Sequence, residues 1–309
     1  MKTDCRTKTI FCFIFVIIVL GGTLFIIYPP VVNSVRKINA FEKGAVFLDL
    51  GQQYWFGDGK KQDYALAVFN FKLAAEKGNA QAAAFLGDAF LYGKGVEIDY
   101  EKAFQYYLKG ANAGDPFAQT GLSVMYLEGY SIPRNLDKAV FWAKKAADQN
   151  VSQGWYSLAI CYLAYHDAER DGEAFQIFKK LSEANVAEAY IELADCYLDG
   201  IGVAPNVQEA EVWYRKALLS DPYSVTSAKI SLAQIYISNA EFKDKIPLAI
   251  QYLTETAEED NYDAQYELAI CYRDGIGVEK NFNKMLYYLK KAAAAGEQSA
   301  IQELSKYKE

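Results

Sequence analysis

The sequence predicts an all-α fold: a right-handed α-solenoid of about seven antiparallel helix pairs plus a C-terminal capping helix, preceded by one transmembrane helix. Three observations support this prediction. A leucine followed four residues later by an aromatic residue recurs about every 36 residues, glycine pairs separate the expected helices, and nineteen uncharged residues run together near the N-terminus. A fixed period in the thirties is typical of helix pairs that stack on one another.

The uncharged run covers residues 10–28 and predicts a transmembrane signal anchor. A helix of about 20 apolar residues spans a bilayer, because every backbone amide must be paired inside lipid. A cleaved signal peptide is the alternative. Its apolar core is usually about 7–15 residues long and ends at a small-x-small site, but no Ala-x-Ala follows before Pro29.

A short basic tail, residues 1–9, precedes the run, and a linker, residues 29–43, leads into the first repeat. Basic residues stand on both sides of the run, so the positive-inside count is nearly balanced. A short basic tail before a first span usually stays in the cytoplasm. The sequence therefore favours a single-pass membrane protein whose repeat body, residues 44–309, is periplasmic or extracytoplasmic.

The repeat body is built on seven marker leucines. These are Leu50, Leu86, Leu122, Leu158, Leu193, Leu232 and Leu268, and their aromatic partners are Tyr54, Phe90, Tyr126, Tyr162, Tyr197, Tyr236 and Tyr272. Residues four apart lie on one face of a helix, so each pair predicts an apolar stripe. A small residue next to most of the leucines, such as Gly51 or Ala194, lets a second helix approach to about 8–10 Å.

A second helix is predicted about seventeen residues after each leucine, where another small residue usually stands. These positions are Ala67, Ala103, Ala139, Ala174, Ala210, Ala249 and, in the last copy, Met285. Four copies place a Gly-x-Gly pair between the two helices: Gly57–Gly59, Gly93–Gly95, Gly200–Gly202 and Gly275–Gly277. The first glycine follows the last helical turn, where a positive φ is needed and glycine adopts it without a Cβ penalty.

The fourth and sixth copies depart from the repeat phrase as a whole. The fourth, "YHDAERDGEAF", lacks the glycine pair, and the turn of the sixth, "SNAEFKDKIPLA", is interpreted as longer by three residues. The segment "SAIQELSKY" carries a leucine 36 residues after the last marker and predicts a lone closing helix. A terminal repeat needs such a lid with a polar outer side.

The phrase "LGDAFLYGKGVEIDYEKAFQYYLKGANAGD" resembles a Sel-one-like repeat, a relative of the tetratricopeptide repeat, and the similarity extends over residues 44–309. The resemblance implies a non-catalytic adaptor in membrane-associated assemblies that binds a protein partner, with no small-molecule substrate. In tetratricopeptide relatives, ligands lie on a concave wall against the residues two, five and six places after the marker leucine. The implied partner-binding residues are Trp55, Phe56, Asp88, Leu91, Tyr92, Val124, Leu127, Glu128, Ile160, Leu163, Asp195, Leu198, Asp199 and Arg273.

The early part of this wall is apolar, and two interpretations stay open. Tight curvature buries these side chains against neighbouring helices, or they form an exposed patch that accepts a partner's helix or extended segment. The later part carries more acidic residues.

Charge argues against a nucleic-acid partner. The chain has a net charge of −7, of which the first 40 residues contribute +4, so the remainder carries −11. Nucleic acid requires Lys and Arg to neutralise its phosphates. The acidic body is compatible with solubility alone or with a basic partner.

No catalytic or metal-binding motif occurs. The sequence lacks GxSxG, HExxH and GxxxxGK[ST], and it holds five cysteines without a CxxC and a single histidine. His166 is expected in a solvated turn, and Cys161, Cys196 and Cys271, each three residues after a marker leucine, are expected as small core residues. The sequence therefore predicts no catalytic residue, no metal and no cofactor.

The leading functional hypothesis is a membrane-anchored interaction scaffold. The alternative is an immunity or inhibitor protein that neutralises a secreted bacterial toxin such as an envelope-targeted lipase, a role filled by some bacterial proteins with similar repeats. A cell-wall or lipid enzyme is the third and weakest hypothesis.

Overall fold

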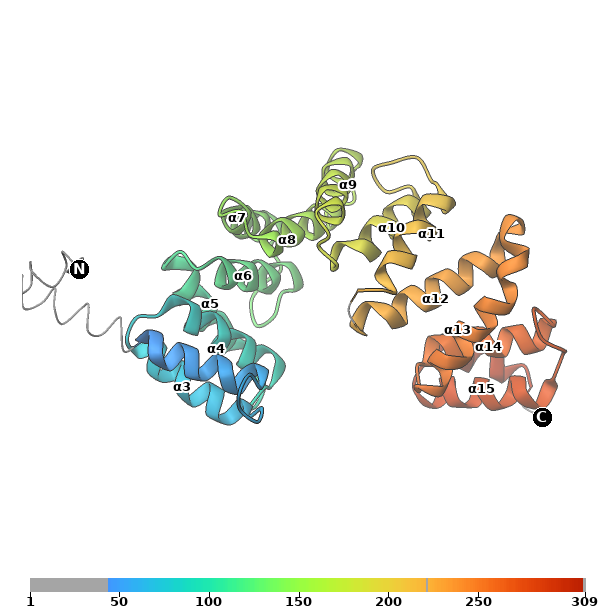
Figure 1. The fold of residues 1–309 in the computed structure, drawn as a ribbon, viewed down its shortest axis with the longest axis horizontal. Coiled ribbons are helices and arrows are strands. Elements are labelled where there is room, and N and C mark those ends of the chain that lie inside the picture. Colours follow the sequence, from blue (N-terminus) through green and yellow to red (C-terminus); the bar gives the residue numbers. More distant parts are fainter. Residues whose placement is uncertain (1–43, 221, 308–309) are drawn as a thin grey trace, which may run out of the picture. The chain divides into compact units, whose positions relative to one another are not determined.

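The computed structural model describes residues 44–220 and 222–307, and all the regular elements within these ranges are helices (Figure 1). The chain divides into two compact units, one up to Ala118 and one from Gln119, so the boundary falls inside helix α6. The predicted tail, anchor and linker, residues 1–43, lie outside the described residues. Among the helices that are described, none is both long and apolar enough to cross a membrane.

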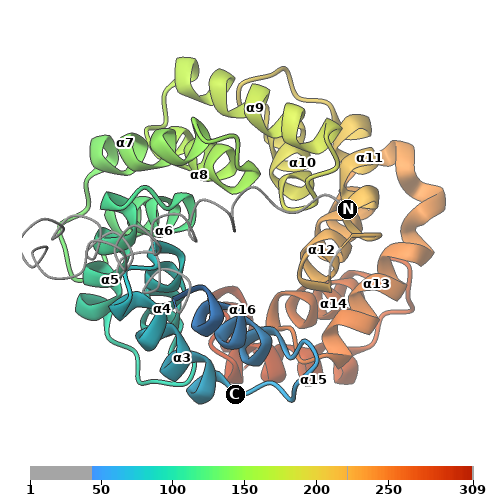
Figure 2. The same ribbon diagram turned by 60° about the vertical axis from the view of Figure 1, so that its left-hand side comes forward.

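The helices alternate between a first and a second helix of each repeat. The first helices are the helix over 44–56, α4 (Ala80–Tyr92), α6 (Pro116–Glu128), α8 (Ser152–Leu163), α10 (Ala189–Asp199), α12 (Pro222–Ser238) and α14 (Tyr262–Asp274). The second helices are α3 (Tyr64–Glu76), α5 (Tyr100–Asn112), α7 (Leu136–Ala147), α9 (Ala168–Glu183), α11 (Val207–Ala217), α13 (Ile246–Glu258) and α15 (Phe282–Ala294). The closing helix, α16 (Gln298–Ser305), packs on α15. Figure 2 shows α7 to α13 of the second unit following one another in chain order. Seven helix pairs and a closing helix are confirmed over the described residues.

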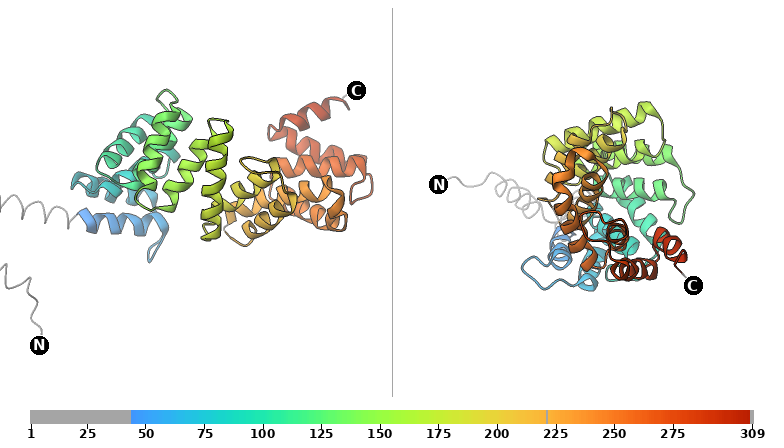
Figure 3. Two further views of the ribbon diagram at one scale, coloured as in Figure 1. Left: turned by 90° about the horizontal axis from the view of Figure 1, so that it is seen from above. Right: turned by 90° about the vertical axis from the view of Figure 1, so that its right-hand side faces the viewer.

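Within each unit, helices that follow one another in the sequence pack side by side (Figure 3). The marker leucines of the second to seventh repeats are buried, and so are the three predicted core cysteines, which confirms their placement. The small residue beside the leucine is required by its neighbour. A Cβ on Gly51 would lie 2.5 Å from the Phe71 ring, and one on Gly87 would lie 2.4 Å from the Tyr107 ring.

Asparagine and aspartate residues start most of the second helices. Asp99, Asn135, Asn206 and Asn281 each accept a hydrogen bond from the backbone N–H three residues on. This bond satisfies one of the amides that the first helical turn leaves unpaired. The sequence signal for a helix start is therefore a capping side chain at a fixed place in the repeat.

The glycine pair of the fifth repeat shows why the motif recurs. Gly200 ends α10 with φ 74°. Gly202 has φ 68°, and a Cβ there would lie 2.2 Å from the backbone oxygen of Asp171 in α9. The pair thus ends one helix and also brings the turn directly onto the second helix of the preceding repeat.

The two irregular repeats differ from the pattern in separate ways. In the fourth, only residues 164–167 join α8 to α9, with His166 exposed at φ 55°. In the sixth, the prediction of a longer turn is wrong. Its aromatic residue and second-helix alanine are thirteen residues apart, as in the regular copies. The extra residues precede the marker leucine, where α12 reaches 17 residues, and a 3-10 helix, η1 (Ala240–Lys245), forms the turn.

Candidate partner-binding surfaces

The position six residues after the marker leucine is exposed in all but the fourth described repeat. In the first two repeats it is aromatic: Phe56 is 65% exposed and Tyr92 is 61% exposed. In the third, fifth and seventh repeats it is an acid, Glu128, Asp199 and Asp274. The ends of the first helices therefore present aromatic side chains in the N-terminal unit and carboxylates in the other unit.

The position five residues after the leucine is buried in the first three repeats. Trp55, Leu91 and Leu127 belong to the hydrophobic core. Trp55 packs edge-on against the rings of Tyr64 and Phe71, with centroids 5.1 and 5.8 Å away. These three side chains offer little surface to a partner, so burial is the outcome for this part of the predicted wall.

Farther along the chain the same position is half-buried. Leu163 and Leu198 pack against the core of the second unit. Arg273 is paired with the neighbouring Asp274 and with Glu303 of the closing helix, both at 2.8 Å. Its predicted binding role thus competes with a structural role in holding α16.

The position two residues after the leucine serves internal contacts. Asp88 accepts a hydrogen bond from the Tyr107 hydroxyl at 2.5 Å, and Asp195 accepts one from Tyr214. Burial raises the pKa of Asp88 to about 6 and also raises the pKa of Asp195. Val124 and Ile160, at the same position, are half-buried.

Lys94 lies among the aromatic residues of the N-terminal unit. Its ammonium nitrogen is 5.3 Å from the Trp55 ring centroid, 5.7 Å from Tyr64 and 5.8 Å from Tyr92. Such cation–π contacts hold the side chain over the rings. Phe56 and Tyr92, together with Lys94, form what we call the aromatic patch.

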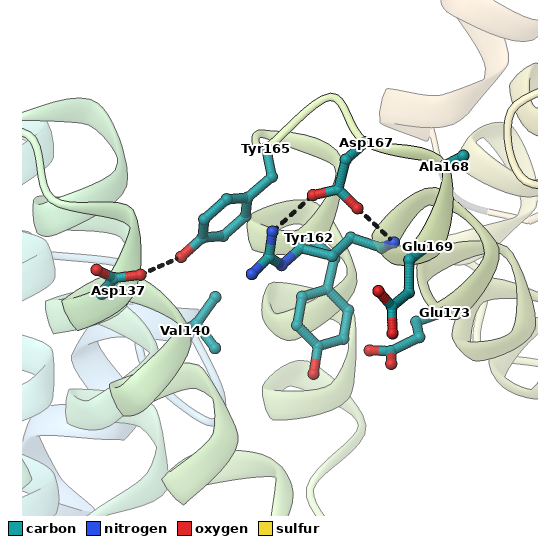
Figure 4. A pocket seen from close by; sticks show the side chains of 9 residues that line it. Asp137, Val140, Tyr162, Tyr165, Asp167, Ala168, Glu169 and Glu173 are labelled. Atoms are coloured by element: carbon teal, nitrogen blue, oxygen red, sulfur yellow. Dashed lines mark hydrogen bonds and ion pairs between the residues drawn. The ribbon is translucent and has the colours of Figure 1, made fainter.

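A second surface, which sequence reasoning did not find, lies at the fourth repeat. A cavity of about 710 Å³ opens between the starts of α7 and α9, beside the end of α8 (Figure 4). Asp137 and Val140 line it from α7, Tyr162 and Tyr165 from α8 and the turn after it. The remaining lining residues are Asp167, Ala168, Glu169, Arg170 and Glu173.

Polar contacts organise this cavity. The Tyr165 hydroxyl donates to Asp137 at 2.7 Å across the opening. The Arg170 guanidinium lies 3.7 Å from the centre of the Tyr165 ring and 2.6 Å from the Asp167 carboxylate (Figure 4). Burial raises the pKa of Tyr165 to about 12, and its hydrogen bond to Asp137 adds to the shift. The cavity therefore holds a hydroxyl that stays protonated and carboxylates that outnumber the single guanidinium.

The missing glycine pair explains the cavity. In the fourth repeat the second-helix residue, Ala174, comes twelve positions after the aromatic residue, Tyr162. In the other repeats this separation is thirteen positions. No turn glycine reaches α7 here as Gly202 reaches α9 in the next repeat. The available sequence signal was this combination of one lost residue and two lost glycines.

Metal-binding clusters and reactive thiols are absent from the described part of the chain. No cluster of three or more His, Cys, Asp or Glu suited to a metal ion occurs there. Burial raises the pKa of the Cys161 thiol, and it raises the pKa values of Cys196 and Cys271 to about 12. These thiols are protonated and enclosed, which does not suit a nucleophile.

Stacked helix pairs with no strand among the described residues define a helical-repeat protein. The Sel1 repeat model matches residues 48–79, 80–115, 116–151, 187–221 and 263–297, which is more than half of the chain. The chain belongs to the Sel1 repeat family. The two repeats without a match are the fourth and the sixth, the copies that the sequence marks as irregular.

One solved structure supports this assignment, and a second is similar in sequence. A Sel1 repeat protein from Oxalobacter formigenes is similar at 26% identity, with a TM-score of 0.60, over 88% of this chain and 78% of that one. A protective antigen of uropathogenic Escherichia coli with the same type of fold is 25% identical, with a TM-score of 0.39, over 86% and 64% of the two chains. No curated protein matches the chain. Sel1 repeat proteins generally act as scaffolds for protein–protein interaction, and this chain has that architecture.

Proposed function

We propose that this protein is a membrane-tethered, non-catalytic scaffold that binds a protein partner along the exposed ends of its first helices. The observation that carries the proposal is the exposure of Phe56 and Tyr92 at the same place in consecutive repeats. Large aromatic residues are enriched at the centres of protein interfaces, because they bury much area at a low entropic cost. Because they stand at the same place in consecutive repeats of one unit, a single partner segment could contact both side chains.

The tether is the part of the proposal that rests on residues 10–28 alone. Their nineteen uncharged residues match the length of a spanning helix. Protease protection in sealed vesicles tests this part: a protected repeat body that stays in the membrane fraction after alkaline washing supports a retained anchor and an extracytoplasmic body. A body released by washing contradicts the tether.

Affinity capture with crosslinking tests the binding surface. The variant Phe56→Ala/Tyr92→Ala is expected to lose at least ten-fold in captured partner relative to the wild type. Phe69→Ala, on the second helix α3 with 59% exposure, is the matched control and is expected to retain the partner. Equal capture by all three proteins contradicts the assignment of this surface. Substitutions at the buried Leu91 or Leu127 are unsuitable, because they disturb the core.

An inhibitor of a secreted toxin is the second candidate, and the acidic helix ends favour it. Glu128, Asp199 and Asp274 contribute exposed carboxylates to a body whose net charge is −11. Such a surface speeds association with a basic partner. Co-expression with a toxin encoded beside this protein, with survival as the readout, is expected to protect cells through the wild type and less through Glu128→Lys/Asp199→Lys. Absence of protection by the wild type removes this candidate.

A further inference from the structure

The cavity at the fourth repeat continues into a longer groove. A neighbouring cavity of about 550 Å³ shares Tyr162, Glu169 and Glu173 with it and extends to Trp155 and Ile177. A third, of about 190 Å³, lies between Trp155, Ile177, Lys180 and Leu181. We call this continuous depression, with α8 as its floor and α7 and α9 as its walls, the fourth-repeat groove.

The groove lies on a different face of α8 from the predicted partner-binding wall. Trp155, Leu158 and Tyr162 follow one another at spacings of three and four, so they share one face of the helix. Ile160, a predicted wall residue, stands two positions after Leu158 and hence about 200° around the helix. The groove is therefore formed by residues other than Phe56 and Tyr92, on which the proposed function rests.

The two ends of the groove differ in charge. At one end four carboxylates, those of Asp137, Asp167, Glu169 and Glu173, face a single guanidinium, which is already paired with Asp167. At the other end Lys144, Lys180 and Asp148 surround an apolar floor. That floor includes Trp155, which is 37% exposed despite its size. The acidic end is complementary to a basic side chain, and the apolar end to a large hydrophobic one.

The length of the groove along α8 sets the spacing expected between the basic and the hydrophobic side chain of a ligand. Trp155 lies eight residues before Leu163, the last residue of α8, which along the helix axis is about 12 Å. An extended chain covers that distance in about four residues. We propose that the fourth-repeat groove binds an extended segment of another protein that carries an arginine or lysine about four residues from an aromatic or large aliphatic side chain.

A display library of random heptapeptides, selected against the full-length chain in detergent, tests the proposal. The wild type is expected to enrich, at least ten-fold, peptides with a basic residue three to five positions from an apolar one. Glu169→Lys/Glu173→Lys is expected to abolish the preference for a basic residue, and Trp155→Ala the preference for an apolar one. Glu258→Lys/Glu259→Lys reverses the same number of exposed charges on α13 and its C-cap and is the matched control, expected to select as the wild type does.

Thermal melting of each variant separates lost binding from lost folding, and only variants that melt as the wild type does enter the comparison. Because Glu169 and Glu173 are exposed, the Glu169→Lys/Glu173→Lys variant is expected to fold. The proposal is overturned if the wild type enriches no such pattern, or if the groove variant and the control select the same peptides. Phe56→Ala/Tyr92→Ala, included in the same selection, is expected to behave as the wild type, so failure of one surface is distinguishable from failure of the other.

Discussion

The fourth and fifth repeats are neighbours in one compact unit, yet they close their helix pairs differently. In the fifth, Gly202 brings the turn against the backbone of α9. In the fourth, a turn one residue shorter places Tyr165 beside Asp137 and leaves a cavity of about 710 Å³. The difference shows that the glycine pair is a contact between successive repeats as well as a helix stop, and that its loss in the fourth repeat goes together with a surface opening.

The same two repeats also differ inside the helix pair. The fifth joins its helices through Asp195 and Tyr214, and the second repeat uses the matching residues Asp88 and Tyr107. The fourth has Ile160 and Phe178 at these places. One geometry therefore accepts either a hydrogen-bonded polar pair or an apolar pair at these two places.

The largest expected effect comes from adding a side chain at Gly202, where the turn of the fifth repeat contacts α9. Gly202→Ala is expected to lower the free energy of unfolding by about 3 kcal/mol, because the new Cβ overlaps the Asp171 oxygen and the positive φ disfavours alanine. Chemical denaturation followed by circular dichroism measures the change.

Gly59→Ala is the control for that substitution. Its φ is 66°, but no atom lies within 4 Å of the added Cβ, so only the conformational cost of about 1 kcal/mol is expected. Equal losses in the two variants would show that the contact with α9 contributes nothing.

The next effect concerns the buried carboxylate that the fourth repeat lacks. The pKa of Asp88 is about 6 in the folded protein, above the ordinary value of 3.8, so the folded state holds the proton more tightly. Asp88 therefore makes a contribution to stability that is present below about pH 4 and is lost as the pH rises to about 6, and Asp88→Asn lacks this contribution. Between pH 4 and 6, the free energy of unfolding of the variant is expected to rise relative to that of the wild type by on the order of 2 kcal/mol. Denaturation at pH 4, 5, 6 and 7 measures it, and parallel profiles contradict the raised pKa.

A double-mutant cycle sharpens the comparison of polar and apolar pairs. Tyr214→Phe alone is expected to cost about 1–2 kcal/mol, because Asp195 loses its donor in a partly buried site. Asp195→Ile/Tyr214→Phe copies the fourth repeat and is expected to recover most of that loss. Urea unfolding of the wild type, both single variants and the double variant gives the coupling. A double variant no more stable than the single Tyr214→Phe would show that the pairs are not interchangeable.

The smallest effect is expected at the irregular turn itself. His166 adopts φ 55° on the surface, a conformation that favours glycine. His166→Gly is expected to raise the free energy of unfolding by up to about 0.5 kcal/mol, because the relief of strain slightly exceeds the added chain entropy. Differential scanning calorimetry detects the shift, and a clear loss of stability would indicate that the imidazole makes a structural contact.

The helix pairs could be predicted from the sequence because each signal is local. A leucine and an aromatic residue four positions apart, an asparagine cap and a glycine pair each act within a few residues. The exposure of single side chains could not be predicted in this way. Trp55 is buried and Phe56 exposed although both are aromatic neighbours, since burial depends on how the next helix pair lies against them.

The groove was missed for a related reason. A cavity follows from an absent contact, and the residues that line it, such as Tyr165 and Arg170, match no motif. The loss of one residue between Tyr162 and Ala174 was visible in the spacing. The structural effect of this loss depends on a tertiary contact, the approach of the second turn glycine to the preceding second helix, as Gly202 shows in the fifth repeat.

The buried cysteines can serve as natural probes of local opening in this protein. Cys161, Cys196 and Cys271 lie at the same place in the fourth, fifth and seventh repeats, enclosed and protonated. A thiol reagent can reach each one only when its own repeat opens. The rate of labelling at each position therefore reports how often that repeat separates from its neighbours, without any engineered probe.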